Sequence, residues 1–135
     1  MNIIEINSNN IFLLNNFIKN KLPNTFRYFN TRDISCVQNH LVTIVGIVDN
    51  KEVAYGHLDY EDNIWLGICI LSEYQGKGYG KQIMNYLLEY SRKNHINEII
   101  LSVDKDNVKA ISLYKKYDFK VKKTTNTYCI MRLRF

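Results

Sequence analysis

A glycine-rich loop that leads from an apolar strand straight into a helix constrains the fold of this chain more than any other feature. The apolar run Ile64–Leu71 precedes the loop, the loop reads Gln75-Gly76-Lys77-Gly78-Tyr79-Gly80, and Gly80–Arg92 carries apolar residues at helical spacing. Alternating glycines let backbone N–H groups approach an anion, and the dipole of the following helix favours negative charge there. Lys77 and Lys81 add positive charge. The segment therefore predicts a phosphate-binding loop.

Two other phosphate-binding loops fit this spacing less well. The dinucleotide fingerprint needs Gly-x-Gly-x-x-Gly after an early strand, but here the third glycine comes one position too soon and the loop lies mid-chain. A P-loop needs Ser or Thr after Gly-Lys, and Gln82 follows Lys81. The remaining alternative is a glycine-rich turn without a ligand, which would not need three alternating glycines before an amphipathic helix.

The hydrophobic periodicity predicts an α+β (mixed α/β) domain that spans residues 1–135, because no linker or repeat interrupts it. Helices are expected from Ser8, as the N-cap, to near Pro23, and over Gly80–Arg92 and Asp106–Tyr117. Thr25–Gln38 is expected to be irregular, with room for one short helix. The expected strands are Ile3–Ile6, Leu41–Val48, Glu52–Tyr60, Ile64–Leu71, Glu98–Val103, Phe119–Val121 and Thr127–Leu133, with a hairpin turn at Asp49-Asn50.

The composition narrows the class of protein. Hydrophobic residues make up 46% and charged residues 23%, as in an ordinary globular domain, which needs no metal or disulfide to hold its core. Cys36, Cys69 and Cys129 are an odd number of widely spaced thiols, so we expect a reducing compartment. No signal peptide or run of ~18 apolar residues is visible, so we expect a cytoplasmic protein without a membrane partner. The net charge of +5 is dispersed along the chain. Since this charge is the only feature that favours nucleic-acid binding, we do not expect a nucleic-acid partner.

A second motif accompanies the glycine loop. The stretch Asp106–Phe119 reads DNVKAISLYKKYDF and is similar to the Asn-x-x-Ala-x-x-Leu-Tyr-x-x-x-Gly-Phe pattern of the GNAT N-acetyltransferase superfamily, whose Gln/Arg-x-x-Gly-x-Gly/Ala signature the loop also matches. Asp118 replaces the usual glycine, and Asp tolerates the left-handed conformation better than most residues. Ser72 replaces a frequent proline. The resemblance implies a mostly antiparallel twisted sheet of six or seven strands, flanked by helices and splayed at an acyl-CoA site.

The resemblance also implies the donor and its binding residues. The donor is acetyl-CoA or another short acyl-CoA, without a metal. The strand Ile64–Leu71 is expected to carry a bulge and to splay from its neighbour, and Gly67 inside it independently fits a bulge or a close backbone approach. Asn107 would contact the pantetheine arm, or alternatively only cap its helix. The expected donor-binding residues are Cys69, Ile70, Gln75, Gly76, Lys77, Gly78, Tyr79, Gly80, Lys81 and Asn107.

Acyl transfer to an amine needs an acid for the leaving thiolate and a base for the ammonium. The resemblance assigns the acid to Tyr114, for which the alternative is a core aromatic residue. His57 has the pKa suited to a base, although a histidine in a strand is often only a core residue. Asp59 could instead hold the cationic amine. Glu73, just before the loop, is a further candidate for the base, His40 is a weaker one, and His95 is expected at the surface.

The acceptor is expected to be a small-molecule amine. The aromatic and basic segment Thr25–Arg32 loosely resembles GNAT members of bacterial surface-glycan pathways and suits a nucleotide-linked amino sugar, unless its aromatic residues simply cover the core. The expected acceptor-binding residues are Arg27, Tyr28, Arg32, Asp59 and Trp65. The alternatives are a protein amino group, a polyamine or aminoglycoside, and a non-catalytic acyl-CoA-binding module. A homodimer also stays open.

Overall fold

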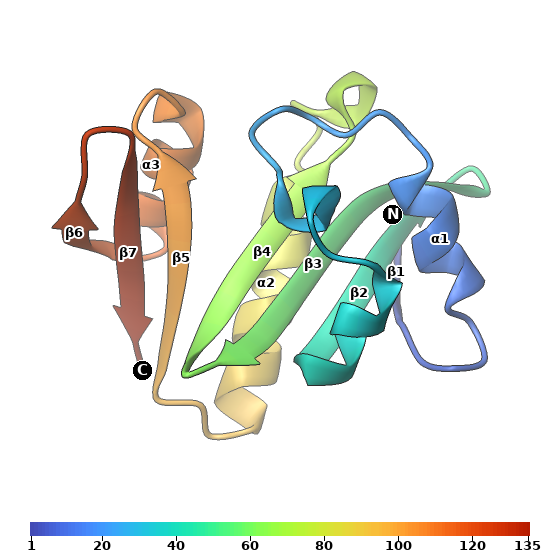
Figure 1. Ribbon diagram of the computed structural model, residues 1–135, viewed down its shortest axis with the longest axis horizontal. Coiled ribbons are helices and arrows are strands. Elements are labelled where there is room, and N and C mark those ends of the chain that lie inside the picture. Colours follow the sequence, from blue (N-terminus) through green and yellow to red (C-terminus); the bar gives the residue numbers. More distant parts are fainter.

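A computed structural model describes residues 1–135 and confirms the mixed α/β architecture with one seven-stranded sheet in the order β1-β2-β3-β4-β5-β7-β6 (Figure 1). Every neighbouring pair is antiparallel except β4 and β5. The strands are β1 (Asn2–Glu5), β2 (His40–Val48), β3 (Lys51–Glu61), β4 (Asn63–Ile70), β5 (Glu98–Asp104), β6 (Lys120–Thr124) and β7 (Tyr128–Arg134). The helices are α1 (Phe12–Ile18), α2 (Tyr79–Lys93) and α3 (Val108–Lys116), with short 3₁₀ helices at Tyr28–Asn30, Ile34–Asn39 and Ser72–Tyr74.

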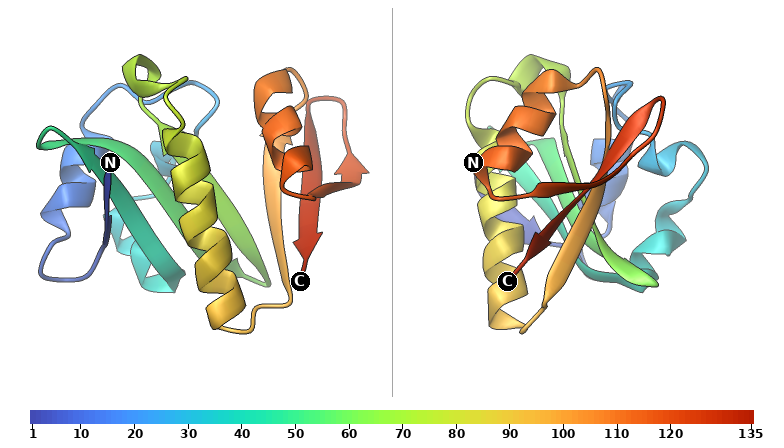
Figure 2. Two further views of the ribbon diagram at one scale, coloured as in Figure 1. Left: turned by 180° about the vertical axis from the view of Figure 1, so that it is seen from behind. Right: turned by 90° about the vertical axis from the view of Figure 1, so that its left-hand side faces the viewer.

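Helices cover both faces of the sheet. Figure 2 shows α2 and α3 on one face, whereas α1 and the segment after it lie on the other. The apolar stripe of α2, which includes Ile83 and Leu87, is buried in the larger core cluster. On the opposite face, Leu14 and Phe17 of α1 pack with Tyr55 of β3. No helix of the structure has the length and apolar content needed to cross a membrane.

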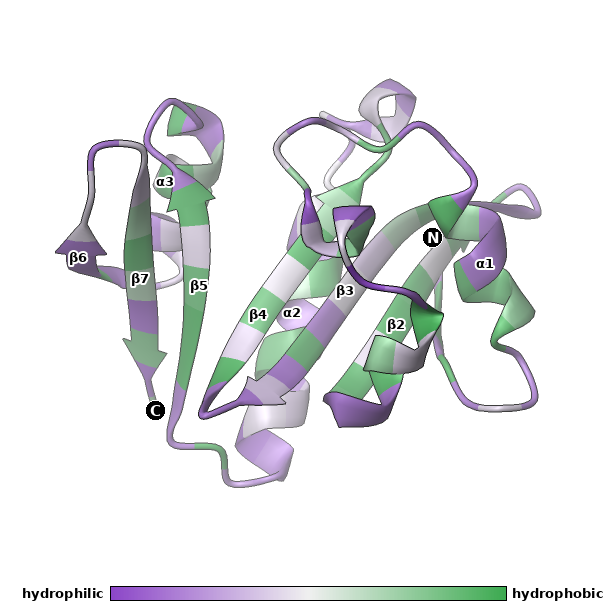
Figure 3. Ribbon diagram, viewed as in Figure 1, coloured by the Kyte–Doolittle hydropathy of each residue, from purple (hydrophilic) through white to green (hydrophobic).

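The edge strand β6 differs from the rest of the sheet. Figure 3 shows mainly hydrophobic residues on β5 and β7 but hydrophilic ones on β6. All five residues of β6 are exposed, and three of them are lysines, Lys120, Lys122 and Lys123. Charged residues on an edge strand oppose pairing with other chains. The lysines of β6 therefore fit the position of this strand at the edge of the sheet.

The hairpin between β2 and β3 is confirmed. Asp49 and Asn50 connect the two strands with φ values of 49° and 63°. Positive φ at both central residues is the mark of a type I′ turn, whose twist matches that of the flanking strands.

The sheet splays between β4 and β5, as predicted. Only Trp65 and Ile100 pair across these two strands, near the start of each. The strands separate toward their carboxyl ends, where the glycine loop and α3 lie (Figure 1). No residue of β4 after Trp65 is paired with a residue of β5.

The predicted bulge in β4 is wrong. The pairing of β4 with β3 is unbroken from Ala54 opposite Ile70 to Glu61 opposite Asn63. The other expectation for Gly67, a close approach to its strand, is the one that holds. A side chain at this position would collide with His57 of β3.

Two expectations for the first forty residues are also wrong. Ser8 does not cap α1: Ile11 occupies the N-cap position without a side-chain bond, and α1 already ends at Ile18, well before Pro23. The preceding turn is held instead by asparagine, since the Asn7 N–H donates to Asn10 Oδ1 (2.7 Å). The segment that was expected to be irregular, with room for one short helix, contains two 3₁₀ helices, Tyr28–Asn30 and Ile34–Asn39.

Asp118 takes the left-handed conformation that its position after α3 requires. Its φ is 71°, and the Phe119 N–H donates to Tyr114 O (3.1 Å), which closes the end of the helix. The substitution of the usual glycine therefore leaves this turn intact, as predicted.

Candidate active site

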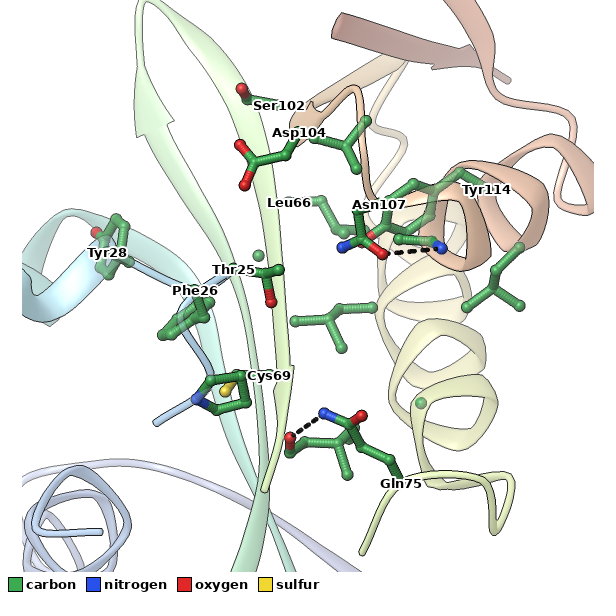
Figure 4. Close-up of a pocket in the computed structure, with 18 of the residues that line it drawn as sticks. Thr25, Phe26, Tyr28, Leu66, Cys69, Gln75, Ser102, Asp104, Asn107 and Tyr114 are labelled. Carbon is green, nitrogen blue, oxygen red and sulfur yellow. Dashed lines mark hydrogen bonds between the residues drawn. The ribbon is translucent and has the colours of Figure 1, made fainter. Parts of the chain in front are cut away.

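A cavity of about 1040 Å³ lies where β4 and β5 separate. Its walls come from β4, the glycine loop, the start of α3, the end of β5 and the segment before β2. Figure 4 shows Phe26 and Tyr28 on one side of the cavity and Asn107 and Tyr114 on the other. The volume is that of a site for a sizeable ligand. The topology thus brings the glycine loop, the second motif and the aromatic segment to one place.

The glycine loop has the backbone conformation of an anion site. Gly76 and Gly78 have φ values of 78° and 85°, and a Cβ at either position would meet no atom within 4 Å. These glycines are therefore required by backbone conformation rather than by lack of space. Gly78 is the N-cap of α2, so the N–H groups of the first turn that follows have no partner within the helix. A diphosphate fits this N-terminus.

Most of the predicted donor-binding residues line the cavity. The Gln75 side chain donates from Nε2 to Ile70 O (3.0 Å), which ties the loop to the end of β4 (Figure 4). Lys77 is the exception, since its Nζ lies 5.4 Å over the Tyr74 ring and the residue does not line the cavity. The others all line it: Cys69, Ile70, Gln75, Gly76, Gly78, Tyr79, Gly80, Lys81 and Asn107.

The free edge of β4 presents the backbone groups of alternate residues. The Leu71 N–H donates to Val53 O of the β3 side (2.9 Å), so residues in step with Leu71, including Cys69, direct their backbone groups to β3. Ile68 and Ile70 are out of step and face the gap. Their N–H groups are therefore the ones available to a ligand between β4 and β5.

Asn107 and Tyr114 bring α3 to the cavity. The Asn107 side-chain oxygen accepts a bond from the Ala110 N–H (3.3 Å), so Asn107 does cap α3 while it lines the cavity (Figure 4). Tyr114 also lines the cavity, and its ring packs on Phe119 with 5.9 Å between centroids. Burial raises the pKa of Tyr114 to about 12. The phenol is therefore protonated near neutrality and can donate a proton.

His57 is almost fully buried, at 3% exposure, yet reaches the cavity wall. Its Nδ1 lies 2.6 Å from the Tyr55 hydroxyl, and its Nε2 lies over Gly67 of β4. Burial, followed by His40 and Arg32, lowers the pKa of His57 well below its usual value. The imidazole is therefore neutral near pH 7 and can accept a proton at one ring nitrogen, although its low pKa limits its strength as a base.

A row of hydrogen bonds leads to the Asp59 carboxylate, another of the predicted site residues. Thr43 Oγ1 lies 2.7 Å from His40 Nδ1, and His40 Nε2 lies 2.7 Å from the Tyr28 hydroxyl. The Tyr28 hydroxyl in turn donates to Asp59 Oδ2 (2.8 Å). Burial lowers the pKa of His40 to about 4, so this imidazole is neutral as well. The row ends on a buried carboxylate that lines the cavity.

The remaining predicted acceptor residues line the same end of the cavity. Arg27 makes a two-pronged ion pair with Asp104 at the end of β5, with N–O distances of 2.7 and 3.0 Å. The Arg32 guanidinium lies 4.3 Å over the Tyr28 ring. Trp65 Nε1 donates to the Glu61 carbonyl (3.2 Å).

Two other candidates for the base, Glu73 and His40, do not line the cavity. Glu73 lies in the 3₁₀ helix before the glycine loop and does not line the cavity. His95 is exposed in the turn between α2 and β5, as predicted. No group of three or more His, Cys, Asp or Glu side chains is arranged to hold a metal ion.

Sequence reasoning missed Asp104 and Glu61, which also line the acceptor end. Asp104 ends the strand that borders the splay, and ligand-binding residues tend to gather at the carboxyl ends of such strands. That position was the available signal. Nothing in the sequence pairs Asp104 with Arg27, which lies 77 residues away.

Comparisons with known proteins agree with this geometry. A family model described as Acetyltransferase (GNAT) family matches residues 12–119. The spermidine N(1)-acetyltransferase of Vibrio cholerae is 32% identical over 84 residues, which are 62% of this chain and 46% of that protein. The L-amino acid N-acetyltransferase AaaT of Escherichia coli is 32% identical over 65 residues, which are 47% of this chain and 40% of that protein. The matched segments span less than half the length of these curated relatives.

A solved structure shares the fold over nearly the whole chain. The structure of yncA from Salmonella typhimurium, determined with its cofactor acetyl-CoA, has a TM-score of 0.78. The match covers 99% of this chain and 93% of that chain at 13% sequence identity. At this identity the likeness concerns the fold alone.

Proposed function

Because the chain belongs to the acetyltransferase (GNAT) family, we propose that it is an enzyme that transfers an acetyl group from acetyl-CoA to a primary amine. The observation that carries the proposal is the continuity of one cavity, which joins the glycine loop, the free edge of β4 and the Tyr114 phenol. A diphosphate held at the glycine loop and the proton donor Tyr114 would then share one continuous space.

The residues of the cavity fit acetyl-CoA, which would supply an acyl group on a thioester. The N–H groups at the start of α2, with Lys81, would hold the diphosphate. The Ile68 and Ile70 N–H groups face the gap between the strands, where they would bond the pantetheine arm and polarise the thioester carbonyl. Asn107 lies across from them at the start of α3.

The proton transfers would be divided between two residues. Tyr114 holds its proton at Oη up to about pH 12 and would deliver it to the departing sulfur. On the other side, His57 Nε2 lies over Gly67 and would take the proton that the attacking ammonium must lose. The lowered pKa of His57 makes it a weak base in the free protein. Asp59 is the alternative residue that could accept this proton.

A nucleotide-linked amino sugar is one acceptor that we propose. Support comes from the aromatic rings of Tyr28 and Trp65 and the guanidinium of Arg32 at the acceptor end. Arg27 gives less support for a phosphate in the acceptor, because its guanidinium already makes two hydrogen bonds to the Asp104 carboxylate. We place this chemistry in a reducing compartment such as the cytoplasm, for which three free cysteines, Cys36, Cys69 and Cys129, are the support.

The experiment that tests the proposal follows free thiol release from acetyl-CoA in the presence of single amines. The panel holds an amino sugar, its nucleotide-linked form, an L-amino acid, spermidine and a peptide with a free amino terminus. Thiol release that depends on one amine, with the N-acetyl product found by mass spectrometry, supports the proposal. Tight CoA binding without turnover of any amine would instead favour a non-catalytic acyl-CoA-binding module.

A further inference from the structure

One buried oxygen at the acceptor end has no hydrogen-bond partner. Asp59 is 3% exposed, and its Oδ2 accepts the bond from Tyr28, but its Oδ1 is buried without any donor. An unpartnered carboxylate oxygen that is shielded from water is costly and is rare in folded proteins. Since Asp59 lines the cavity, a ligand can supply the missing donor.

The surrounding row of hydrogen bonds leaves the negative charge of Asp59 unopposed. Donation can run in one direction, from Thr43 to His40, from His40 to Tyr28, and from Tyr28 to Asp59. His40 and Tyr28, which lie between Thr43 and Asp59 in this row, are both neutral groups. Arg32 bonds to the Tyr28 carbonyl (3.1 Å) rather than to Asp59.

The other carboxylates at this end are already engaged. Asp104 receives both prongs of Arg27 at 2.7 and 3.0 Å. Glu61 Oε2 lies 4.0 Å from Arg32 in a loose, exposed ion pair. The cavity therefore offers one unpaired carboxylate, which matches one ammonium group rather than the several of a polyamine.

A positively charged group that could bind an anion, the Arg32 guanidinium, lies near this carboxylate. Tyr28 joins the two, because its hydroxyl binds Asp59 while the Arg32 guanidinium covers its ring at 4.3 Å. Arg32 keeps unused N–H donors, since it makes one bond to a carbonyl and one loose ion pair. Groups of opposite charge thus stand on the same aromatic residue.

From these contacts we propose that the acceptor is a small amine that also carries an anionic group. Its ammonium binds Asp59 Oδ1, and its carboxylate or phosphate binds Arg32. The inference rests on the proposed function, whose acceptor it specifies. Because Asp59 is almost fully buried, the ammonium reaches it when the segment that carries Tyr28 and Arg32 shifts, and connecting segments of this kind move more readily than strands.

Calorimetry on the protein saturated with CoA, which carries no acetyl group, measures amine binding without turnover. The probes are two matched pairs, L-methionine with L-methioninamide and glucosamine 6-phosphate with glucosamine, together with spermidine. We expect the anionic member of at least one pair to bind about tenfold tighter or more, as a charged hydrogen bond provides. The pair that responds tells an amino acid from a sugar phosphate. Tighter binding of spermidine, or no binding of any probe, overturns the inference.

Single variants test which residue binds the ammonium and which binds the anionic group of the acceptor. Asp59→Asn keeps an acceptor for Tyr28 but removes the charge, so it should weaken every amine about tenfold or more with an unchanged Kd for acetyl-CoA. Arg32→Gln changes an exposed residue. It should abolish only the tighter binding of the anionic amine over its uncharged partner in each pair of probes. Tyr28→Phe removes the hydrogen bond to Asp59 but retains the carboxylate charge, so it should weaken amine binding less than Asp59→Asn does. Equal amine affinities in Asp59→Asn and the wild type contradict the inference, whereas thiol release by the wild type tests the proposed function separately.

Discussion

Gly67 of β4 lies directly opposite His57 of β3, and the imidazole occupies the space that a side chain at position 67 would fill. A Cβ built on Gly67 would be 2.5 Å from His57 Nε2 and 2.6 Å from Cε1. The glycine therefore allows a buried histidine to lie over β4 at the wall of the cavity.

Gly67→Ala should destabilise the protein by about 1–3 kcal/mol, because a methyl group in filled space forces His57 or the strand to move. Urea unfolding followed by circular dichroism measures this loss. The double variant Gly67→Ala with His57→Ala is the control, and it should be more stable than the sum of the two single changes predicts. Simple additivity of the two losses would show that the imidazole and the new methyl group do not compete.

Tyr114→Phe should lower kcat about 100-fold or more, since it removes the proton donor for the leaving sulfur. Acetyl-CoA binding should change little, because the ring and its packing on Phe119 remain. Steady-state kinetics and calorimetry with CoA separate the two effects. Tyr117→Phe on the same segment is the matched control, since this hydroxyl donates to Asn85 (2.9 Å) outside the cavity. An equal kcat in Tyr114→Phe and the wild type would remove Tyr114 from the mechanism.

Features that depend on a few adjacent residues could be predicted from the sequence. Gly76, Gly78 and Asp118 have the positive φ values that their places beside helices demand. The Asp49-Asn50 turn is local in the same way, because its conformation sets the register of the hairpin. Such features need no knowledge of distant parts of the chain.

Features that depend on contacts between distant segments could not be predicted. Glycine inside a strand signals either a bulge or a close approach, and only the structure shows that His57 decides between them at Gly67. The Arg27–Asp104 pair joins residues 77 positions apart, and no local pattern links them. The place of Asp59 at the end of the row through Tyr28 and His40 likewise depends on the path of the irregular segment before β2.

Stability should fall as the pH falls from about 7 to about 5. His57 and His40 have folded-state pKa values below the usual 6.5, chiefly because of burial, with the value of His40 at about 4. Below about pH 6.5 both imidazoles take up protons in the unfolded chain but stay neutral in the folded protein. The free energy of unfolding therefore decreases as the pH is lowered. Urea unfolding at several pH values in this window measures the slope.

Variants of single histidines identify the source of that slope. His57→Gln should flatten the pH dependence, whereas His95→Gln should leave it unchanged because His95 is exposed. A slope in His57→Gln as steep as that of the wild type would contradict the role of this residue.

Two glycines of the loop should respond to alanine with opposite signs. Gly78 has a φ of 85°, so Gly78→Ala places an L side chain in the left-handed region at a cost of about 1–2 kcal/mol, although nothing obstructs the methyl group. Gly80 lies in the first turn of α2, and the nearest atom to a new Cβ is Ile70 Cγ1 at 3.9 Å. Gly80→Ala should therefore stabilise the protein by about 0.5–1 kcal/mol, since alanine is the better helix former.

Thermal unfolding of the two variants, with calorimetry of acetyl-CoA binding, tests this contrast. Gly78→Ala should weaken binding as well, because the loop must leave the conformation that directs its N–H groups at the diphosphate. Gly78→Asn, with a residue that visits the left-handed region more readily, should fall between the wild type and Gly78→Ala in stability. A stabilising Gly78→Ala would mean that backbone conformation is not what requires glycine in this loop.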